Sequence, residues 1–555
     1  MKNLKIHPPS NFYAETDVKP SLTRASLVRD FLNLEEIPYV FGNPGTTETT
    51  FLEAVGRSKA EYRLALHEST AVGIAAGYAM VTRKPALVSL HTYPGLANGL
   101  FNMRNALLSG VPLLVINGQQ DSRFLIHNPV LGAPNAQLAE TATKYSYEVT
   151  QAPDLAIALQ RCWLQARLQP NGPIFLSIPM NFMQEPMEEV GLRRTTVLDD
   201  VVPSGLDQLA KALQDESGGP LAIVADYAVG ASEALQYLSR LASHLGADLY
   251  SAPFHVQGVV DPLHPNYCGQ LPATTREIRG VLSRYRRLLL LGEKIDTFTF
   301  NGEQAIPATL KIFQLAPSTS QLGFDYPCDL AVLGDLCACL KGLVNLLGAP
   351  DLQAFHRDEA EVWAQLQVEY SGHGAHASDA LILHLLQQLP RHYHLVTEGS
   401  SEDALVQRMA IALGFTNVHF APRGGGLGWA MPLGVGIALG TGQPSVCFVG
   451  DGGAQFSIHA IWSAARYRIP TVFICFVNRE YRILKDLWCA AMNTSIDQTS
   501  FVGLDFDDPE VDLESIARGY GARTAWLPDT SAVERELEAA LTHAGPSFLL
   551  IEREP

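Results

Sequence analysis

The chain has 555 residues, of which 47% are hydrophobic and 17% are charged, and its formal net charge is −17. A chain of this length accommodates roughly three to four domains with large cores, and its composition is that of an ordinary globular protein. The acidic balance argues against a nucleic-acid partner and against binding to an anionic membrane.

Targeting signals and cysteine motifs give little positive information. Residues 1–20 lack the apolar segment of a secretory signal, and no apolar run reaches the roughly 18 residues of a membrane span. The eight cysteines are scattered, and the close pair Cys337 and Cys339 has no partner pair at zinc spacing. We therefore expect reduced thiols and a cytoplasmic location.

Three strand ends in the first third of the chain carry polar residues. A short strand, Tyr39–Phe41, breaks into a Pro/Gly turn that contains Thr46, a common ligand-facing position in α/β sheets. Another strand delivers Glu68 to the start of a helix of small residues, and a further one ends at His91. Each also has an ordinary explanation: a tight turn, an acid at a helix N-terminus and a structural histidine. Two residues after the next strand are candidates for orienting a substrate, namely Gln119 and Gln120.

The middle of the chain alternates helical stretches with strands, for which we expect the ranges Leu221–Val224, Arg287–Leu291, Thr309–Leu315 and Leu330–Leu333. Gly292 and Glu293 follow one of these strands, but this is too little for a dinucleotide-binding fingerprint. His264 stands in a His-Pro turn, for which a structural role is the more common explanation.

The stretch Ser445–Trp488 predicts a βαβ unit, because two continuous apolar runs flank an amphipathic helix. The carboxyl ends of both strands lie at one edge of the sheet, so Asp451 and Asn478 should converge. A carboxylate and an amide oxygen suit Mg²⁺ that is also bound by phosphate oxygens. Gly452 and Gly453 allow the backbone to approach a phosphate, and the next helix presents free N–H groups. The alternative is an ordinary Gly-Asp-Gly turn.

This Gly-Asp-Gly turn, followed about two dozen residues later by Asn, resembles the motif of thiamine diphosphate enzymes such as benzoylformate decarboxylase, pyruvate decarboxylase, acetolactate synthase and benzaldehyde lyase. The resemblance implies three Mg²⁺ ligands: Asp451, the Asn478 side chain and the backbone carbonyl of Glu480. The chain departs from the family at Val477, where a first Asn is usual. Since the second Asn is the usual ligand, we expect metal binding to survive.

The same resemblance assigns the Gly-rich turn and other cofactor contacts. Leu427 matches the leucine that wedges under the cofactor and forces its V shape, and Gly425 matches the glycine whose carbonyl accepts from the cofactor's amine. Such preorganisation holds two groups of one cofactor together. The predicted cofactor contacts are Glu68, Ser400, Ser401, Gly425, Leu427, Asp451, Gly452, Gly453, Asn478 and Tyr481.

The same resemblance implies roles for the residues at the strand ends in the first third of the chain. The sequence FGNPGTTE is similar to FGNPGSNE of benzoylformate decarboxylase, where the serine touches the substrate carboxylate, so Thr46 takes that position here. Glu68 matches the glutamate that hydrogen-bonds the aminopyrimidine N1′. His91 matches an active-site histidine, which implies proton transfer or carboxylate binding. A second active-site histidine of that enzyme has no counterpart in Gly292–Phe300, and the nearest upstream candidate is His264.

The motifs occur in the family's order over almost the whole chain after residue 20. We therefore expect an α/β protein with three doubly wound parallel-sheet domains. The expected segments are an N-terminal arm (1–20), a pyrimidine-binding domain (21–190), a central domain (200–348) and a diphosphate-binding domain (375–555). The resemblance places the site between the first domain of one subunit and the last domain of another, so a dimer is the minimum and a homotetramer is usual.

The implied activity is thiamine diphosphate- and Mg²⁺-dependent, non-oxidative decarboxylation of an aromatic or bulky apolar 2-oxo acid to an aldehyde. Ile483, Leu484 and Leu487 are expected along the substrate pocket. One alternative is a carboligase that joins two carbonyl compounds to a 2-hydroxyketone. A second is a non-catalytic binding protein on the same fold, against which the presence of Glu68 and Asp451 argues.

Overall fold

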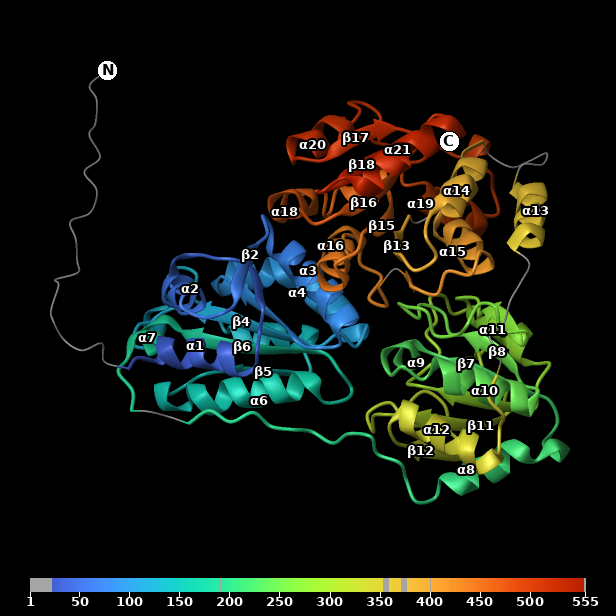
Figure 1. Ribbon diagram of the computed structural model, residues 1–555, viewed down its shortest axis with the longest axis horizontal. Helices are drawn as coiled ribbons and strands as arrows, with labels where there is room; N and C mark the ends of the chain where they lie inside the picture. The colour runs from blue at the N-terminus through green and yellow to red at the C-terminus, as the bar shows by residue number, and fades with distance from the viewer. Residues whose placement is uncertain are drawn as a thin grey trace.

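Three parallel sheets follow one another along the chain. The computed structural model describes residues 22–188, 191–352, 359–370, 377–399, 401–420 and 422–553. Within them each sheet has six strands that pair in parallel, with helices packed on both faces (Figure 1). The predicted three-sheet α/β fold is confirmed. The predicted arm over residues 1–20 lies outside the described residues.

The first sheet has the strand order β2-β1-β3-β4-β6-β5. Its order reverses between β1 and β3, which pair so that Asn43 lies opposite Leu90. The loops after these two strands therefore open into the crevice where α/β sheets bind ligands. The strands are β1 (Tyr39–Asn43), β2 (Glu61–Leu64), β3 (Ala86–Leu90), β4 (Leu113–Gln119), β5 (Tyr145–Glu148) and β6 (Pro173–Pro179). The helices are α1 (Arg24–Leu34), α2 (Thr49–Gly56), α3 (Glu68–Thr82), α4 (Thr92–Leu108), α5 (Asn135–Ala139), α6 (Leu155–Arg167) and α7 (Met180–Gln184).

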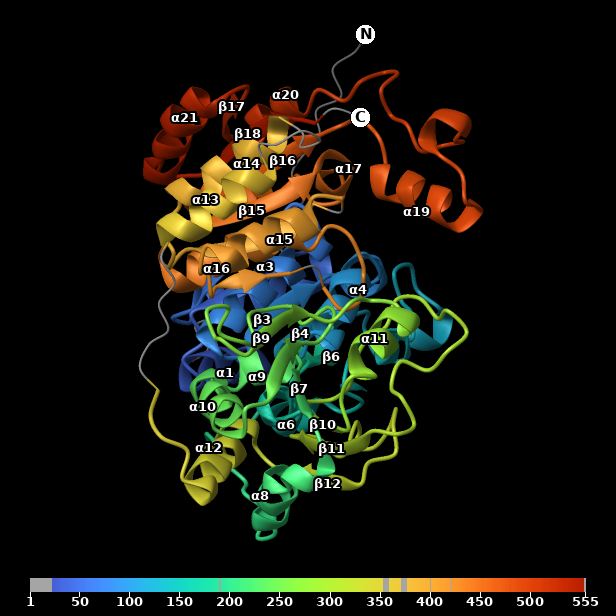
Figure 2. The same cartoon turned by 90° about the vertical axis from the view of Figure 1, so that its right-hand side faces the viewer.

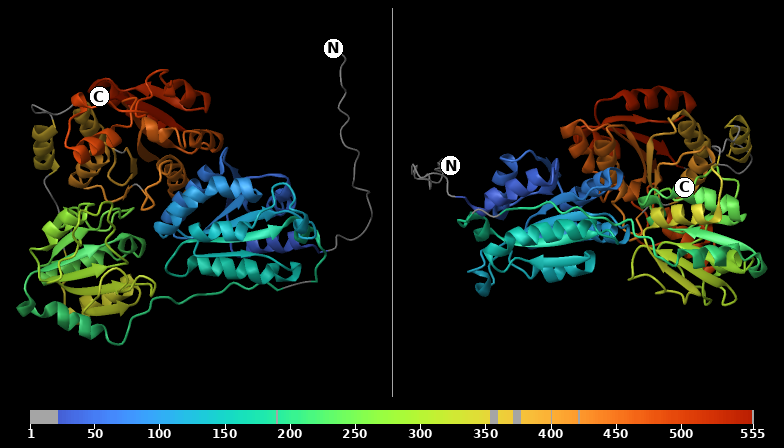
Figure 3. Two further views of the ribbon diagram at one scale, coloured as in Figure 1. Left: turned by 180° about the vertical axis from the view of Figure 1, so that it is seen from behind. Right: turned by 60° about the horizontal axis from the view of Figure 1, so that its bottom comes forward.

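The central sheet has the order β12-β11-β10-β7-β8-β9. An extended segment joins it to the first domain, as the view from behind shows (Figure 3). Its strands are β7 (Leu221–Ala225), β8 (Asp248–Ser251), β9 (Tyr267–Gln270), β10 (Arg287–Leu291), β11 (Lys311–Ala316) and β12 (Leu330–Leu333). The helices are α8 (Leu206–Gln214), α9 (Tyr227–Ala231), α10 (Leu235–Leu245), α11 (Thr275–Leu282) and α12 (Leu336–Leu347), and α13 (Glu359–Tyr370) follows before the last domain.

The last sheet, β14-β13-β15-β16-β18-β17, repeats the order of the first. Its switch point lies between β13 and β15, where Glu398 pairs with Val449. The strands are β13 (His394–Glu398), β14 (Val418–His419), β15 (Ser445–Gly450), β16 (Thr471–Val477), β17 (Arg523–Trp526) and β18 (Ser547–Glu552). The helices are α14 (Ala377–Gln388), α15 (Asp403–Ala412), α16 (Ala430–Thr441), α17 (Asp451–Ala454), α18 (Ala460–Tyr467), α19 (Arg482–Met492), α20 (Leu513–Gly519) and α21 (Thr530–Thr542).

The first and last domains pack directly on each other through α3 and α16. Glycines let the two helix backbones touch: a Cβ at Gly77 would overlap the Leu433 carbonyl, and one at Gly436 would overlap the Ile74 carbonyl. One apolar cluster includes buried residues of both sheets and of both helices. This shared core fixes the two ligand-binding edges relative to each other within the chain. Among the described helices, none has the length and apolar character needed to cross a membrane.

Candidate active site

His91 is held at the switch point of the first sheet by residues from the loop after β1. Its Nδ1 lies 2.8 Å from Oε2 of Glu48 and 3.1 Å from Oγ1 of Thr47. The Glu48 carboxylate is buried and also accepts from the Gly45 N–H at 2.8 Å. A Cβ at Gly45 would overlap the imidazole ring, so only glycine leaves room for the histidine there. With Nδ1 on the carboxylate, Nε2 makes no hydrogen bond to the described residues.

The loop after β1 places its polar residues differently from the sequence-based expectation. Thr46 opens the short 3-10 helix Thr46–Glu48 and is exposed, whereas Thr47 is buried and donates to Oε1 of Glu48 at 2.5 Å. The structure therefore brings Thr47 and Glu48 against His91, neither of which the sequence analysis selected. The signal in the sequence was a carboxylate three residues after Gly45, the spacing of a capping box.

Glu68 begins α3 and lies on the same side of α4 as His91. Its Oε2 accepts from Nδ2 of Asn98 at 3.0 Å. A Cβ at Gly95 would lie 3.4 Å from both Oε1 of Glu68 and Cβ of His91, so the two side chains flank one glycine in the first turn of α4. A carboxyl group and an imidazole thus share this edge of the first sheet.

Asp451 anchors the corresponding edge of the last sheet. Its buried carboxylate accepts N–H groups of Gly452, Asn478 and Arg479 at 2.8, 2.9 and 2.6 Å. Burial raises the pKa of Asp451, while these three N–H groups oppose that rise. The loops after β15 and β16 are thereby tied together.

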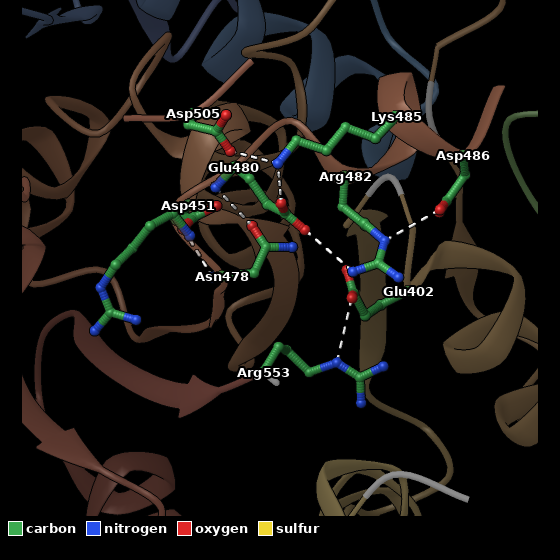
Figure 4. A network of polar contacts seen from close by, with 10 residues as sticks. Glu402, Asp451, Asn478, Glu480, Arg482, Lys485, Asp486, Asp505 and Arg553 are labelled. Atoms are coloured by element: carbon green, nitrogen blue, oxygen red, sulfur yellow. Dashed lines mark hydrogen bonds and ion pairs between the residues drawn. The ribbon is translucent and has the colours of Figure 1, made fainter. Parts of the chain in front are cut away.

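Asn478 and Glu480 continue the same loop beside Asp451 (Figure 4). Oδ1 of Asn478 accepts from the Glu480 N–H at 3.1 Å. The Glu480 carboxylate is occupied by Lys485 and, at 3.2 Å, by Arg482. Its backbone carbonyl accepts no N–H from the described part of the chain, so this oxygen remains open for another ligand.

A buried carboxyl that the sequence analysis did not select holds the end of the Gly-rich turn. Glu398, at the end of β13, accepts N–H groups of Gly428, Trp429 and Ala430 at 3.1 to 3.3 Å. Burial raises the pKa of Glu398 to about 8. Gly425 and Gly428 have φ of 67° and 89°, values that favour glycine.

Arg423 ties the start of this turn to the other domains. It donates to Oδ2 of Asp296 in the central domain at 2.6 Å and to the Leu108 carbonyl in the first domain at 2.9 Å. Asp296 belongs to the segment in which the sequence analysis found no second histidine. That segment therefore anchors the Gly-rich turn of the last domain.

Comparison with known proteins agrees with this arrangement. The chain matches the thiamine pyrophosphate enzyme models for the N-terminal TPP binding domain (residues 22–137), the central domain (206–343) and the C-terminal TPP binding domain (405–551). It is 30% identical over 527 residues to benzoylformate decarboxylase of Pseudomonas aeruginosa, covering 93% of this chain and 95% of that protein. The chain belongs to the thiamine pyrophosphate enzyme family.

Other relatives show the breadth of this enzyme family. The acetolactate synthase large subunit of Haemophilus influenzae is 23% identical, with 94% of this chain and 92% of that protein covered. Benzoylformate decarboxylase from Polynucleobacter necessarius has the same fold, with a TM-score of 0.84 at 24% identity over 96% of this chain and 98% of that structure. The protein is thus an enzyme with thiamine pyrophosphate-dependent lyase or carboligase activity, and the non-catalytic alternative is not supported.

The donor set at the last sheet fits the diphosphate and metal of a thiamine pyrophosphate enzyme. A carboxylate, an amide oxygen and an open carbonyl are hard oxygen ligands of the kind that Mg²⁺ binds. The ring of Tyr481 lies so close to Gly452 that a Cβ there would be 2.7 Å from it, whereas a Cβ at Gly453 would have 3.6 Å to its nearest neighbour. The Ser401 hydroxyl has no partner within the described ranges, and Ser400 lies outside them.

Of the remaining predicted residues, three are exposed on α19 and two are buried with hydrogen-bond partners. Ile483, Leu484 and Leu487 are 36%, 47% and 49% exposed on α19, which stands away from the last sheet (Figure 2). Gln119 is buried and donates to Ala133 and Glu148. His264 is buried in the central domain, where Nε2 contacts Ser243 and Ser239 and Nδ1 accepts from Asn266. These bonds explain His264 as a structural histidine.

Proposed function

We propose that the protein is a thiamine diphosphate- and Mg²⁺-dependent decarboxylase that converts an aromatic or bulky apolar 2-oxo acid to an aldehyde and carbon dioxide. The observation that carries the proposal is the pair of His91 and Glu48 beside Glu68. The buried Glu48 carboxylate on Nδ1 orients the imidazole ring and leaves Nε2 open for proton transfer. Release of an aldehyde requires a proton at the carbon that carbon dioxide leaves, and His91 supplies it.

The cofactor would be held by residues of two domains. Asp451, the Asn478 side chain and the Glu480 carbonyl would bind Mg²⁺, and Gly452, Gly453, Ser400, Ser401 and Tyr481 would contact the diphosphate end. When bound, thiamine diphosphate supplies the nucleophilic carbon and the electron sink of the reaction. Glu68 would hold a proton at the aminopyrimidine N1′. Leu427 would support the bent shape of the cofactor, and the carbonyl of Gly425 would accept from its amine.

The substrate would lie between the polar edge of the first sheet and apolar residues of α19. His91 and Thr46 would face its carboxylate, and Ile483, Leu484 and Leu487 would contact the apolar group. Their large exposure in the single chain agrees with a site completed by a second subunit, and we propose a homo-oligomer of at least two chains, a tetramer being usual in the family.

The first experiment follows carbon dioxide and organic products from benzoylformate, phenylpyruvate, pyruvate and branched 2-oxo acids with the enzyme loaded with thiamine diphosphate and Mg²⁺. Stoichiometric aldehyde from an aryl or bulky acid is the expected result. Carbon dioxide without aldehyde, or no turnover of any acid, would contradict the proposal.

Glu68→Gln is the matched variant in this assay. The amide keeps the shape of the carboxyl group but cannot share a proton with N1′, so we expect loss of about 10²-fold or more in kcat. Thiamine diphosphate affinity should change little. Unchanged turnover by Glu68→Gln would remove Glu68 from the proposed mechanism.

A carboligase is the second candidate, favoured by one observation. The segment 292–300 contains no histidine, and its Asp296 binds Arg423, so the site has fewer proton donors than the decarboxylase resemblance implies. Fewer donors would leave more time for a second carbonyl compound to react. In the product assay a 2-hydroxyketone in place of aldehyde would identify this activity.

A further inference from the structure

The backbone beside His91 is in an unusual conformation. Thr92, the first residue of α4, has φ of 37° and is fully buried. Positive φ is strained for a β-branched residue, and such strain persists only where the surroundings enforce it. The Thr92 hydroxyl is buried without a partner among the described residues, so the threonine side chain does not itself hold this turn.

Asn117 supplies hydrogen bonds on both sides of the turn. This residue lies in β4, where it pairs with Leu90, and its side chain is fully buried. Its Nδ2 donates to the carbonyl of Leu90 at 3.1 Å and to the carbonyl of Thr92 at 2.8 Å. These are the two carbonyl groups that flank His91, so one amide group fixes the chain before and after the histidine.

The two halves of the His91 environment are therefore built separately. Glu48 and Gly45 hold the imidazole ring, whereas Asn117 holds the backbone that carries it. We infer that Asn117 is a positioning residue that keeps Thr92 in its left-handed conformation and thereby directs His91 toward the substrate. This inference rests on the proposed function of His91, and Asn117 itself acts without touching substrate or cofactor.

The test uses the full-length protein with the variants Asn117→Ala, Thr92→Gly and the double variant. Glycine adopts a positive φ without strain, so Thr92→Gly should need no support from Asn117. Asn266→Ala is the matched control, because Asn266 makes the same type of bond, from Nδ2 to the Ala247 carbonyl at 3.0 Å, in the central domain.

Crystal structures give a readout that is independent of any substrate. In Asn117→Ala we expect residue 92 to relax to negative φ and the contact between His91 Nδ1 and Glu48 to lengthen beyond hydrogen-bond distance. In the double variant residue 92 should keep positive φ and the contact should remain. An unchanged turn in Asn117→Ala would overturn the inference.

Kinetics provide the second readout. We expect Asn117→Ala to lower kcat about ten- to a hundredfold, with KM and cofactor affinity nearly unchanged, because a displaced proton donor mainly affects the chemical step. The double variant should recover most of this loss, and Asn266→Ala should keep wild-type kcat. A loss that Thr92→Gly does not rescue would refute the positioning role. Full activity of His91→Ala would instead refute the proposed function, so the two failures are distinguishable.

Discussion

At the scale of single residues, the site depends on carboxyl groups that are buried with a partner. Glu48 and Asp451 are both removed from water, and each accepts hydrogen bonds from groups fixed in the backbone or on a ring. Burying a carboxylate without hydrogen-bond partners costs free energy. The carboxylate therefore favours the conformation in which each partner stays within hydrogen-bond distance. The contact between Glu48 and His91 therefore orients the imidazole ring and also gives the buried carboxylate a hydrogen-bond partner.

Replacing Glu48 with Gln should reduce turnover while leaving the fold intact. The amide is isosteric but replaces one acceptor oxygen of the carboxylate with a donor, so it orients the imidazole less strictly, and we expect kcat to fall by about 10²-fold, the usual size of a general-acid contribution. Steady-state kinetics of Glu48→Gln, His91→Ala and the double variant check this. The double variant should be no slower than His91→Ala alone, because the pair acts as a unit.

Glu53→Gln is the matched control for that experiment. Glu53 lies in the next helix, on the surface, where it pairs with Arg57. Its replacement should leave kcat unchanged. Additive losses in the Glu48 and His91 double variant would mean that Glu48 does not act through the histidine.

A further residue-scale prediction concerns the wedge in the Gly-rich turn. Leu427→Ala should slow turnover, because a shortened side chain supports the bent cofactor less well. The products should stay the same, since proton transfer by His91 is untouched. Product analysis by chromatography alongside kcat tests this, and a new product spectrum would count against the wedge role.

At the scale of elements, local patterns in the sequence were sufficient for the βαβ unit of the last domain. Its apolar runs became β15 and β16, and the amphipathic segment became α18. Three of the four predicted central strands match β7, β10 and β12 closely, because continuous apolar runs mark buried parallel strands. The short strands β8 and β9 were missed, since Asp248–Ser251 and Tyr267–Gln270 mix polar and apolar residues without a clear period.

Local sequence patterns could not predict the contacts that complete the site, for a physical reason. Glu48 meets His91, Asn117 meets Thr92, and Glu398 meets Ala430, each across 25 to 43 residues. Such pairs are created by sheet register and helix packing, and neither leaves a local period in the sequence. Residues at strand ends could therefore be selected, but the partners that orient them could not.

The Gly-rich turn gives a stability prediction at this scale. The side chain of Arg423 is 6% exposed and lies 2.6 Å from Asp296 and 3.7 Å from Glu293. Arg423→Met leaves the buried Glu293 without this cation and leaves the half-buried Asp296 with Lys294, so we expect a loss of roughly 3–5 kcal/mol in the free energy of unfolding. Urea denaturation measures it.

The control for Arg423 is Arg279→Met, which removes the more exposed pair with Glu303. Surface pairs contribute about 1 kcal/mol or less, so this variant should be close to wild type. Adding Glu293→Gln to Arg423→Met should recover part of the loss, because it removes the buried negative charge that lost its partner. Equal stability of the two arginine variants would show that Arg423 does not stabilise the contacts between the domains.

At the scale of the whole molecule, four buried or half-buried histidines lie at or beside contacts between domains. His459 of the last domain contacts Oγ1 of Thr70 in the first domain at 2.6 Å. His255 of the central domain packs on Phe420 of the last domain, and His419, which forms a β-bridge with Gln257 of the central domain, contacts His394 of its own domain at 2.9 Å. Burial lowers the pKa of His255, His394 and His459 to about 4 and that of His419 to about 3.

These shifts predict a stability maximum near pH 6.5. Between pH 6.5 and 4 the unfolded chain binds more protons at these histidines than the folded chain, so stability is lost as the pH falls, by up to about 1.4 kcal/mol per pH unit for each histidine. Burial raises the pKa of Asp226 to about 7 and that of Glu398 to about 8. The folded protein therefore loses stability as the pH rises toward these values and the two carboxyl groups ionise. Below pH 6.5 the effect of the four histidines on stability outweighs that of the two carboxyl groups, and between pH 6.5 and about 8 the two carboxyl groups dominate.

Urea midpoints at about pH 5, 6.5 and 8 test this balance. His419→Asn should flatten the acidic limb, because it removes the histidine with the largest pKa shift of the four. Glu398→Gln should flatten the alkaline limb, since the amide cannot ionise. His127 is exposed, so His127→Asn should leave both limbs unchanged. A midpoint that stays constant from pH 6.5 to 5 would mean that the histidines at the domain contacts become protonated without loosening those contacts.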